Sequence, residues 1–400
     1  MPLAMVDAAT ERPIGVGRNH RYLPELEALR GWAMVLVYTF HLNGTVARRA
    51  SGAADDPTPL SAFVLAGHTG VSLFFVLSAF LLALPFLAEA DGGRRLSRPA
   101  YATRRALRIL PLYWTAVVIA AVLSADQLAD LARGLPYLVF LNSLSDWSTP
   151  LLPYSGAWWS LGTEAQFYLV LLLLPLLLAS RAGRVAGVLL LLAWTAAYVA
   201  FLTRALHMDT ITGQIRLAYS LFGRAPLFLC GIAAAALYRR HGATWRARLA
   251  EWPLLRRGGA DAILLAGLLT LGLLLQWVIV IGPSKAEGPP LHAWHILEGV
   301  LWSAVVLFVL LAPLRVAPLI TNRATIWLGM VSYSVYIWHL PILHYVFRWT
   351  RRLGVSLPLA WNARTLAVAV LATAVCLGVS ALTYRWIERP FLTRKERIGD

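Results

Sequence analysis

Apolar stretches of about twenty residues recur along the whole chain, and they constrain its fold more than any other feature. The chain has 400 residues, of which 58% are hydrophobic, whereas a soluble domain is typically about 45–50% apolar. A helix needs about 20 mostly apolar residues to cross the hydrocarbon core of a bilayer. No polar block between the stretches is long enough to fold alone. The sequence therefore predicts an all-α polytopic membrane protein.

Ten spans can be delimited, so both termini are expected on the same side of the membrane. The approximate spans are 31–48, 64–87, 109–124, 158–179, 185–203, 217–238, 261–281, 295–312, 325–347 and 363–385. Cytoplasmic segments of membrane proteins are enriched in Lys and Arg. With the N-terminus inside, 25 of the 36 basic residues lie in cytoplasmic segments and 10 in external ones. This asymmetry predicts a multi-pass protein of the cell (inner or plasma) membrane with both termini in the cytoplasm.

The chain is expected to form a single integral membrane domain over residues 1–400. Four polar segments flank or interrupt the spans. They are a cytoplasmic tail at 1–29, a basic cytoplasmic loop at 88–108, an external loop at 125–157 and a cytoplasmic tail at 386–400. The second half of the loop at 88–108 has the pattern of a surface helix.

One external segment departs from the charge asymmetry. Residues 348–362 contain Arg348, Arg351 and Arg352, and Arg364 follows directly. Contact with an anionic substrate or a lipid headgroup would explain this departure.

The overall charge does not indicate a nucleic-acid partner. The formal net charge is +16, but arginines that anchor cytoplasmic loops account for it. No basic stripe with interleaved aromatic residues stands outside the spans. The two cysteines, Cys230 and Cys376, lie inside apolar stretches and show no metal-binding spacing. We therefore expect no nucleic acid and no metal.

Arg30 and His41 bracket the first apolar stretch. Eleven residues turn a helix through about 1100°, so both side chains point the same way, about 16 Å apart along the axis. Arg30 would then lie at the membrane surface and His41 near the midplane, where an ionisable group is expensive and is expected to have a function. A cation at the surface and a basic nitrogen one pantetheine arm deeper suit an acyl-CoA enzyme with His41 as general base. A packing role for His41 explains its depth equally well.

Four further polar groups fall into the same layer when depth is counted along each span: Ser78, Glu164, Arg224 and His339. The Glu164 carboxylate is expected to orient His41 or stabilise its cation, and a structural pair with Arg224 or with another span is the alternative. Ser78 lacks the sequence of a nucleophile elbow, so close helix approach is its favoured role. Arg224 and His339, with Ser78, are interpreted as a polar layer with a substrate-contacting or structural role.

Three arginines stand at the mouth of the third span: Arg104, Arg105 and Arg108. Arg105 and Arg108 are three residues apart and share a helix face. Arginine forks suit phosphate and pyrophosphate groups. From their spacing alone, however, these arginines would be interpreted as ordinary cytoplasmic anchors that fix the orientation of the span.

Seven segments, taken together and in order, resemble acyltransferase family 3, a family of integral membrane O-acyltransferases. They are LEALRGWAMVLVYTFH, GVSLFFVLSAFLL, RRALRILPLYW, WSLGTEAQFYL, GRAPLFLCG, SYSVYIWHLP and YRWIERPF, within residues 22–391. The resemblance implies a ten-helix enzyme that uses acyl-CoA, such as acetyl-CoA or another short acyl-CoA, as donor. It implies that Arg30 and His41 are the family's Arg-x10-His pair and that Arg105 and Arg108 are its Arg-x-x-Arg.

Members of the family acylate sugars of surface polysaccharides and lipopolysaccharide, or sugars and hydroxyls of secondary metabolites. The implied acceptor is therefore a hydroxyl of a carbohydrate or of a glycosylated or lipidic molecule. Some members carry an additional soluble hydrolase-like domain at the C-terminus, which this chain is expected to lack because it stops at Asp400. Ser78-Ala79 stands where the family usually has serine-glycine, and the added methyl group bears on the shape of the acyl channel.

Two other function classes compete with the enzyme. A transporter or flippase for a glycan or lipid intermediate would also have ten spans and a polar midplane layer. A polytopic scaffold is the second alternative, but it gives no reason for the shared face of Arg30 and His41. The sequence leaves the acceptor, the acyl chain, the side from which the acceptor enters and the oligomeric state open.

Overall fold

The fold is given by a computed structural model. It describes residues 6–7, 12–13, 22–47, 66–124, 128–142, 152, 154–205, 219–281, 290–355, 361–396 and 398.

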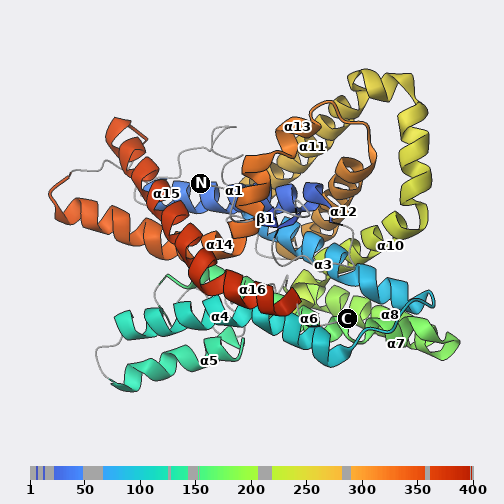
Figure 1. Cartoon of the computed structure of the whole chain (residues 1–400), viewed down its shortest axis with the longest axis horizontal. Helices are drawn as coiled ribbons and strands as arrows, with labels where there is room; N and C mark the ends of the chain where they lie inside the picture. The colour runs from blue at the N-terminus through green and yellow to red at the C-terminus, as the bar shows by residue number, and fades with distance from the viewer. Residues whose placement is uncertain are drawn as a thin grey trace.

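The described part of the chain is almost entirely helical (Figure 1). Two short strands, β1 (Val6–Asp7) and β2 (Arg12–Pro13), pair antiparallel near the N-terminus. The elements of the first half are α1 (Pro24–Ala47), η2 (Ala66–His68), α3 (Thr69–Ala90), α4 (Arg98–Ser124), η3 (Leu128–Gly134), α5 (Leu135–Leu138), η5 (Gly156–Trp158), α6 (Trp159–Leu171), α7 (Leu174–Ala179) and α8 (Arg181–Ala205). Those of the second half are α10 (Leu221–Glu251), η6 (Leu255–Gly259), α11 (Ala260–Ile281), α12 (Pro290–Leu311), α13 (Ala317–Ile320), α14 (Arg323–Arg352), α15 (Ala363–Thr383), η7 (Tyr384–Glu388) and α16 (Arg389–Glu396).

The predicted spans are found as helices. Each of the ten expected segments coincides with a helix, and the fourth is divided between α6 and α7. Within the described ranges, nine helical segments are long and apolar enough to cross a membrane. Helix α1 is the exception because Arg30, His41 and Asn43 interrupt its apolar residues. The prediction of an all-α polytopic membrane protein is confirmed.

Several helices extend beyond the predicted apolar cores. Helix α4 begins at Arg98, so the surface helix expected within loop 88–108 is continuous with the third span. Helix α10 continues to Glu251, and α14 continues to Arg352. The arginines that follow or precede these cores are therefore held on rigid helices, which fixes their positions relative to the membrane-spanning residues.

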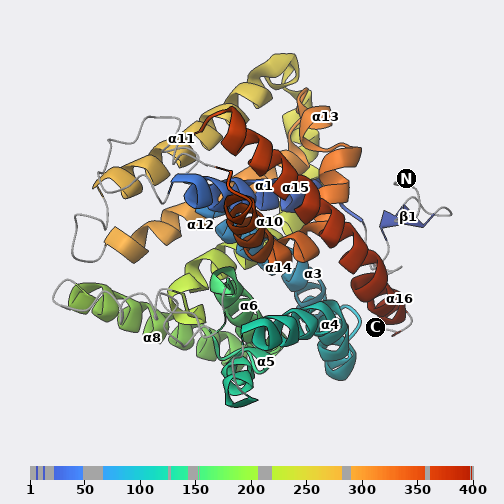
Figure 2. The ribbon, with the colours of Figure 1, turned by 90° about the vertical axis from the view of Figure 1, so that its left-hand side faces the viewer.

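Helix α1 lies in the interior of the bundle, with α14 and α3 packed along it (Figures 1 and 2). Glycines allow the close approach of α1 and α14. A Cβ atom on Gly329 would collide with the carbonyl oxygen of Glu27, and one on Gly31 would collide with that of Thr325. Small residues at helix interfaces let backbones approach closely in membrane proteins. This contact sets the register of α1 against α14.

Helix α8 lies at the edge of the bundle (Figure 2). Leu189, Leu190, Leu191 and Leu192 are all exposed on it. A helix that is apolar all round is typical of a membrane span. These side chains therefore face lipid hydrocarbon rather than water.

Gly329→Ala should destabilise the protein, because the new methyl group forces α1 and α14 apart. Overpacking of this kind typically costs about 1–3 kcal/mol. The matched control is Gly378→Ala in α15, where an added Cβ meets nothing within 4 Å. The measurement is the temperature at which half of the detergent-solubilised protein loses its monodisperse size-exclusion peak. Equal midpoints for the two variants would contradict the assigned α1–α14 contact.

Candidate functional site

Two histidines from α1 and α14 meet inside the bundle. His339 Nε2 lies 3.2 Å from His41 Nδ1, and the ring centroids are 4.9 Å apart. His339 is fully buried and His41 is half-buried. Sequence analysis placed both residues in one layer, and the structure brings them into direct contact.

Two backbone carbonyls determine the protonation pattern of this pair. His339 Nδ1 lies 2.7 Å from the Tyr336 carbonyl oxygen. A carbonyl oxygen only accepts, so Nδ1 of neutral His339 carries the proton and its Nε2 is an acceptor. His41 Nδ1 must then be the donor, both to His339 and to the Val37 carbonyl oxygen at 3.0 Å. This assignment leaves the lone pair of neutral His41 on Nε2.

Glu164 on α6 is bound to α3. Its Oε1 accepts hydrogen bonds from Ser78 Oγ at 2.5 Å and from Tyr168 Oη at 2.6 Å. Hydrogen bonds of this kind compensate a carboxylate for its loss of water. Nδ1 of His41 meets His339 rather than Glu164, because α14 and not α6 packs along α1. The link between Glu164 and His41 stays a prediction.

Tyr336 lies between these two groups. Its ring centroid is 5.5 Å from that of His339, and its hydroxyl is 2.7 Å from Ser160 Oγ, one turn before Glu164 on α6. The same residue supplies the carbonyl that holds the His339 ring. Tyr336 therefore connects the histidine pair to α6, the helix that carries Glu164. Sequence analysis missed Tyr336, although it stands three residues before His339.

Arg108 is held in an ion pair. Its Nη1 lies 3.3 Å from Glu388 Oε2, and its guanidinium lies over the Tyr333 ring at 5.8 Å. Glu388 also accepts a hydrogen bond from Ser334 and is 2% exposed. The positive charge of Arg108 is thus balanced by the Glu388 carboxylate in η7. Sequence analysis missed Glu388, although it is the acidic residue of the segment YRWIERPF.

Arg105 has a different environment. Its guanidinium lies 6.0 Å from the Tyr101 ring, and its buried Nε has no hydrogen-bond partner. Arg105 makes no ion pair with an acidic residue in the described ranges. It acts electrostatically on Tyr168, as does Glu164. Arg105 therefore lies between the membrane surface and the Glu164 cluster.

The first turns of α1 and α4 and the end of α16 gather cations at one face. Arg30 pairs with Glu27 at 3.5 Å. The charges of Arg30, Arg104, Arg105 and Arg108 all act on Lys395. The four arginines predicted to bind the donor thus lie at one face of the bundle. Lys395 adds a fifth basic residue, which sequence analysis did not assign.

Arg224 belongs to a separate buried cluster. Its Nη1 lies 3.2 Å from His295 Nδ1, which in turn lies 2.9 Å from Glu298 Oε2. Thr69 Oγ1 donates to the other oxygen of Glu298 at 2.5 Å. The guanidinium also lies 5.1 Å from the Trp159 ring. Arg224 therefore joins α10 to α12 and α6. The structural partner of Glu164 is Ser78 on another span and not Arg224.

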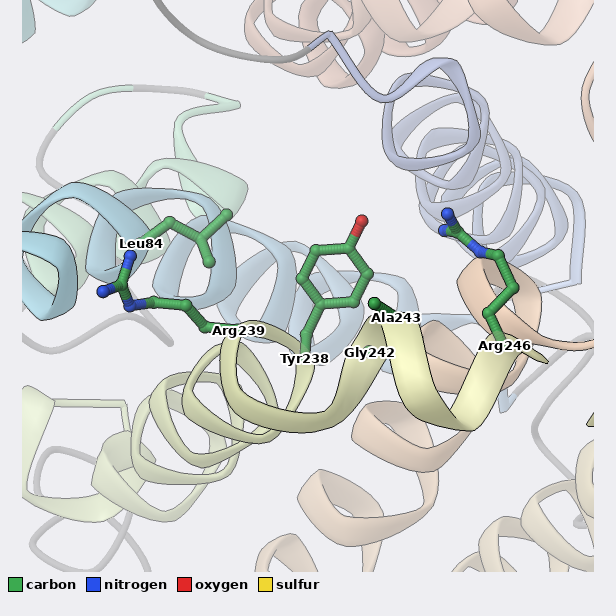
Figure 3. A pocket seen from close by; sticks show the side chains of 6 residues that line it. All are labelled: Leu84, Tyr238, Arg239, Gly242, Ala243 and Arg246. Carbon is green, nitrogen blue, oxygen red and sulfur yellow. The ribbon is translucent and has the colours of Figure 1, made fainter. Parts of the chain in front are cut away.

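A cavity of about 320 Å³ lies between the ends of α3 and α10. Its lining residues are Leu84, Tyr238, Arg239, Gly242, Ala243 and Arg246, with the Tyr238 ring between the two arginines (Figure 3). Deeper along these helices, a Cβ atom on Gly231 would lie 2.7 Å from the Ala79 Cβ. The Ala79 methyl therefore packs on α10.

Among the described residues, no three His, Cys, Asp or Glu side chains form a group that could hold a metal ion. Cys230 and Cys376 are both free thiols.

Comparison with known proteins bears on the residues of the candidate site. Residues 23–384 match the family model of the acyltransferase domain of acyltransferase family 3. The chain belongs to this family. The match includes both histidines, Glu164 and the four arginines, and thus covers the whole polar layer. Membership in acyltransferase family 3 favours an enzyme over a transporter or flippase.

Named relatives are distant and mostly longer. Peptidoglycan O-acetyltransferase OatA of Listeria monocytogenes is 22% identical over 93% of this chain and 56% of its own length. The putative peptidoglycan O-acetyltransferase YrhL of Bacillus subtilis is 24% identical over 94% and 56%. The putative membrane-bound transacylase BcsY of Komagataeibacter xylinus is 26% identical over 79% and 72%. The chain thus spans little more than half the length of OatA and YrhL. No solved structure matches it.

Glu388→Ala should strongly destabilise the protein, because it leaves Arg108 buried without its acid. Breaking a buried ion pair from one side typically costs about 3–5 kcal/mol. Glu251→Ala, at an exposed acid on α10, is the control. The double variant Arg108→Met, Glu388→Ala should recover part of the loss, since no lone charge remains. The thermal unfolding midpoint in detergent is measured for all three variants. A Glu388→Ala midpoint equal to that of Glu251→Ala would contradict the Arg108–Glu388 ion pair.

Proposed function

We propose that this chain transfers an acyl group, in the simplest case acetyl, from acyl-CoA to a hydroxyl of a carbohydrate or of a glycosylated or lipidic acceptor. The main support is the His41–His339 pair, whose hydrogen bonds leave a lone pair on His41 Nε2. The pair lies inside the helical bundle of a member of acyltransferase family 3. The names of OatA and YrhL support acetyl as the acyl group and a glycan as the acceptor.

In the proposed reaction His41 is the general base. Nε2 takes the proton of the acceptor hydroxyl while the hydroxyl oxygen attacks the thioester carbonyl carbon. The carbon–sulfur bond then breaks, and the CoA thiolate takes the proton back from the His41 imidazolium. The products are the O-acyl ester and free CoA. His339 positions the His41 ring and accepts from it throughout.

Glu164 is proposed to support this step from the neighbouring level. Its negative charge favours the protonated form of His41 that arises when the acceptor loses its proton. Tyr336, which contacts His339 and Ser160, holds the two groups in a fixed relation. Ser78 stabilises the Glu164 carboxylate by donating to it.

The donor is proposed to bind at the face that carries Arg30, Arg104, Arg105 and Arg108. Acyl-CoA has an adenosine 3′-phosphate and a pyrophosphate, which arginine forks recognise. The pantetheine arm is about as long as the 16 Å that separate Arg30 from His41 along α1. The thioester can thus reach His41 while the head stays at the surface. The excess of basic residues on this side supports a cytoplasmic position for this face.

His41→Ala should lower acyl transfer by about 10²–10⁴-fold, because general-base assistance contributes about that factor. The variant should still insert and purify as wild type. His241→Ala, at an exposed histidine on α10, is the matched control and should be fully active. The readouts are thiol release from acetyl-CoA and mass spectrometry of O-acetylated surface glycans in cells. Near-wild-type acylation in a well-expressed His41→Ala variant would contradict the assignment of His41 as general base.

Arg105→Gln should weaken CoA binding by about 10–100-fold, the loss expected for one charge-assisted hydrogen bond to phosphate. It should slow a donor-saturated reaction much less, since the contact is distant from the carbonyl. Arg108→Gln should instead mainly lower stability, because Arg108 holds Glu388. The control is Arg240→Gln at an exposed arginine of α10.

Calorimetric titration with CoA in nanodiscs compares these variants. A titration in sealed inside-out vesicles, which expose the cytoplasmic face, tests the side of the site as well. If Arg105→Gln bound CoA like the parent, Arg105 would be a topology anchor and the donor site would lie elsewhere.

A further inference from the structure

A second group of arginines lies at the end of the bundle opposite Arg30. Arg348, Arg351 and Arg352 occupy the last turns of α14, and Arg364 lies in the first turn of α15. We name these four residues the distal arginine surface. Arg348, Arg352 and Arg364 are exposed, and Arg351 is half-buried. None of the four forms an ion pair with an acid of the described ranges.

The depth of the distal arginine surface corresponds to that of lipid headgroups. Arg348 follows His339 by nine residues, or about 14 Å along α14. Half of a hydrocarbon core is about 15 Å thick, so a midplane position for His339 puts Arg348 at the interface. Tyr345, Trp349 and Trp361 are 44%, 67% and 47% exposed. Exposed Tyr and Trp side chains are typical of the membrane–water interface.

Topology does not explain these positions, and helix stability explains only two of the four. With the cytoplasm at the Arg30 face, the distal arginine surface is external, where arginines are normally depleted. Arg351 and Arg352 do complement the negative end of the α14 dipole. Arg364, however, follows the cap residue Asn362 of α15, and a cation in the first turn opposes the helix dipole. An anion at this surface would remove that cost.

The surface is attached to the helix that carries His41. Trp361 Nε1 donates to Asn43 Oδ1 at 3.0 Å, and Asn43 stands two residues after His41 on α1. Val46, Phe347 and Ala369 pack together in one buried cluster that joins the ends of α1, α14 and α15. The distal arginines are therefore held rigidly beside the His41 end of α1.

We propose that the distal arginine surface binds the phosphate headgroup of a membrane lipid in the leaflet on that face. Guanidinium groups match phosphate oxygens in charge and geometry. The surrounding Tyr and Trp side chains lie where acyl chains meet headgroups, which favours a lipid over a free phosphate ion. The proposal does not depend on the transfer reaction. It adds a lipid site that lies on the opposite face from the proposed donor arginines.

Native mass spectrometry of the detergent-solubilised full chain tests this site. The probes are phosphatidic acid and phosphatidylcholine with identical acyl chains, and inorganic phosphate is the competitor. The test variant combines Arg348→Gln, Arg352→Gln and Arg364→Gln, and the control combines Arg240→Gln, Arg256→Gln and Arg323→Gln, at exposed arginines distant from the surface. Wild type and control should retain phosphatidic acid over phosphatidylcholine.

The test variant should bind phosphatidic acid about 100-fold more weakly, the effect expected for three arginines at a membrane surface. Arg364→Gln alone should weaken it about fivefold, which keeps the test valid if the triple variant does not fold. Unchanged phosphatidic acid binding in the variants, or equal retention of both lipids by wild type, would overturn the proposal. Displacement of the lipid by millimolar inorganic phosphate would overturn it as well, because the site would then select free phosphate.

Discussion

The contact between α1 and α14 is the interaction on which the rest of the structure depends. Gly31 and Gly329 let the two backbones approach so closely that a methyl group at either position would collide with a carbonyl oxygen of the other helix. Only at this separation can the His41 and His339 rings meet across the interface. The positions of these two rings are thus set by residues about one membrane leaflet away, near the face where the arginines gather.

Apolar patterning was sufficient to predict the ten helices, because a span of hydrocarbon-compatible residues has few other ways to satisfy its backbone. The helix ends were not predictable in the same way. The first turns of α4 carry Arg98, Arg104 and Arg105, which have no apolar signal, yet they continue the helix without interruption. Helix propagation through polar residues depends on local propensity and on neighbours such as α16, which a hydropathy pattern does not report.

Depth counting predicted that His41 and His339 lie in one layer, but it could not predict which polar groups touch. Only the packing of helices around α1 decides that His339 reaches His41, while Ser78 and Glu164 bind each other between α3 and α6. The Arg108–Glu388 pair shows the same limit, since it joins residues that are 280 positions apart. A single sequence contains the charges but not the angular order of the helices that carry them.

The hydrogen bonds of the histidine pair also limit how much charge the middle of the bundle can hold. His339 donates through Nδ1 to a backbone carbonyl and accepts through Nε2 from His41, so its ring already uses both nitrogens. A proton added to His41 Nε2 leaves this arrangement intact. A second proton on His339 would place two N–H groups face to face at 3.2 Å. The two rings therefore behave as one unit that alternates between neutral and singly positive, and the apolar interior never has to accommodate two adjacent cations.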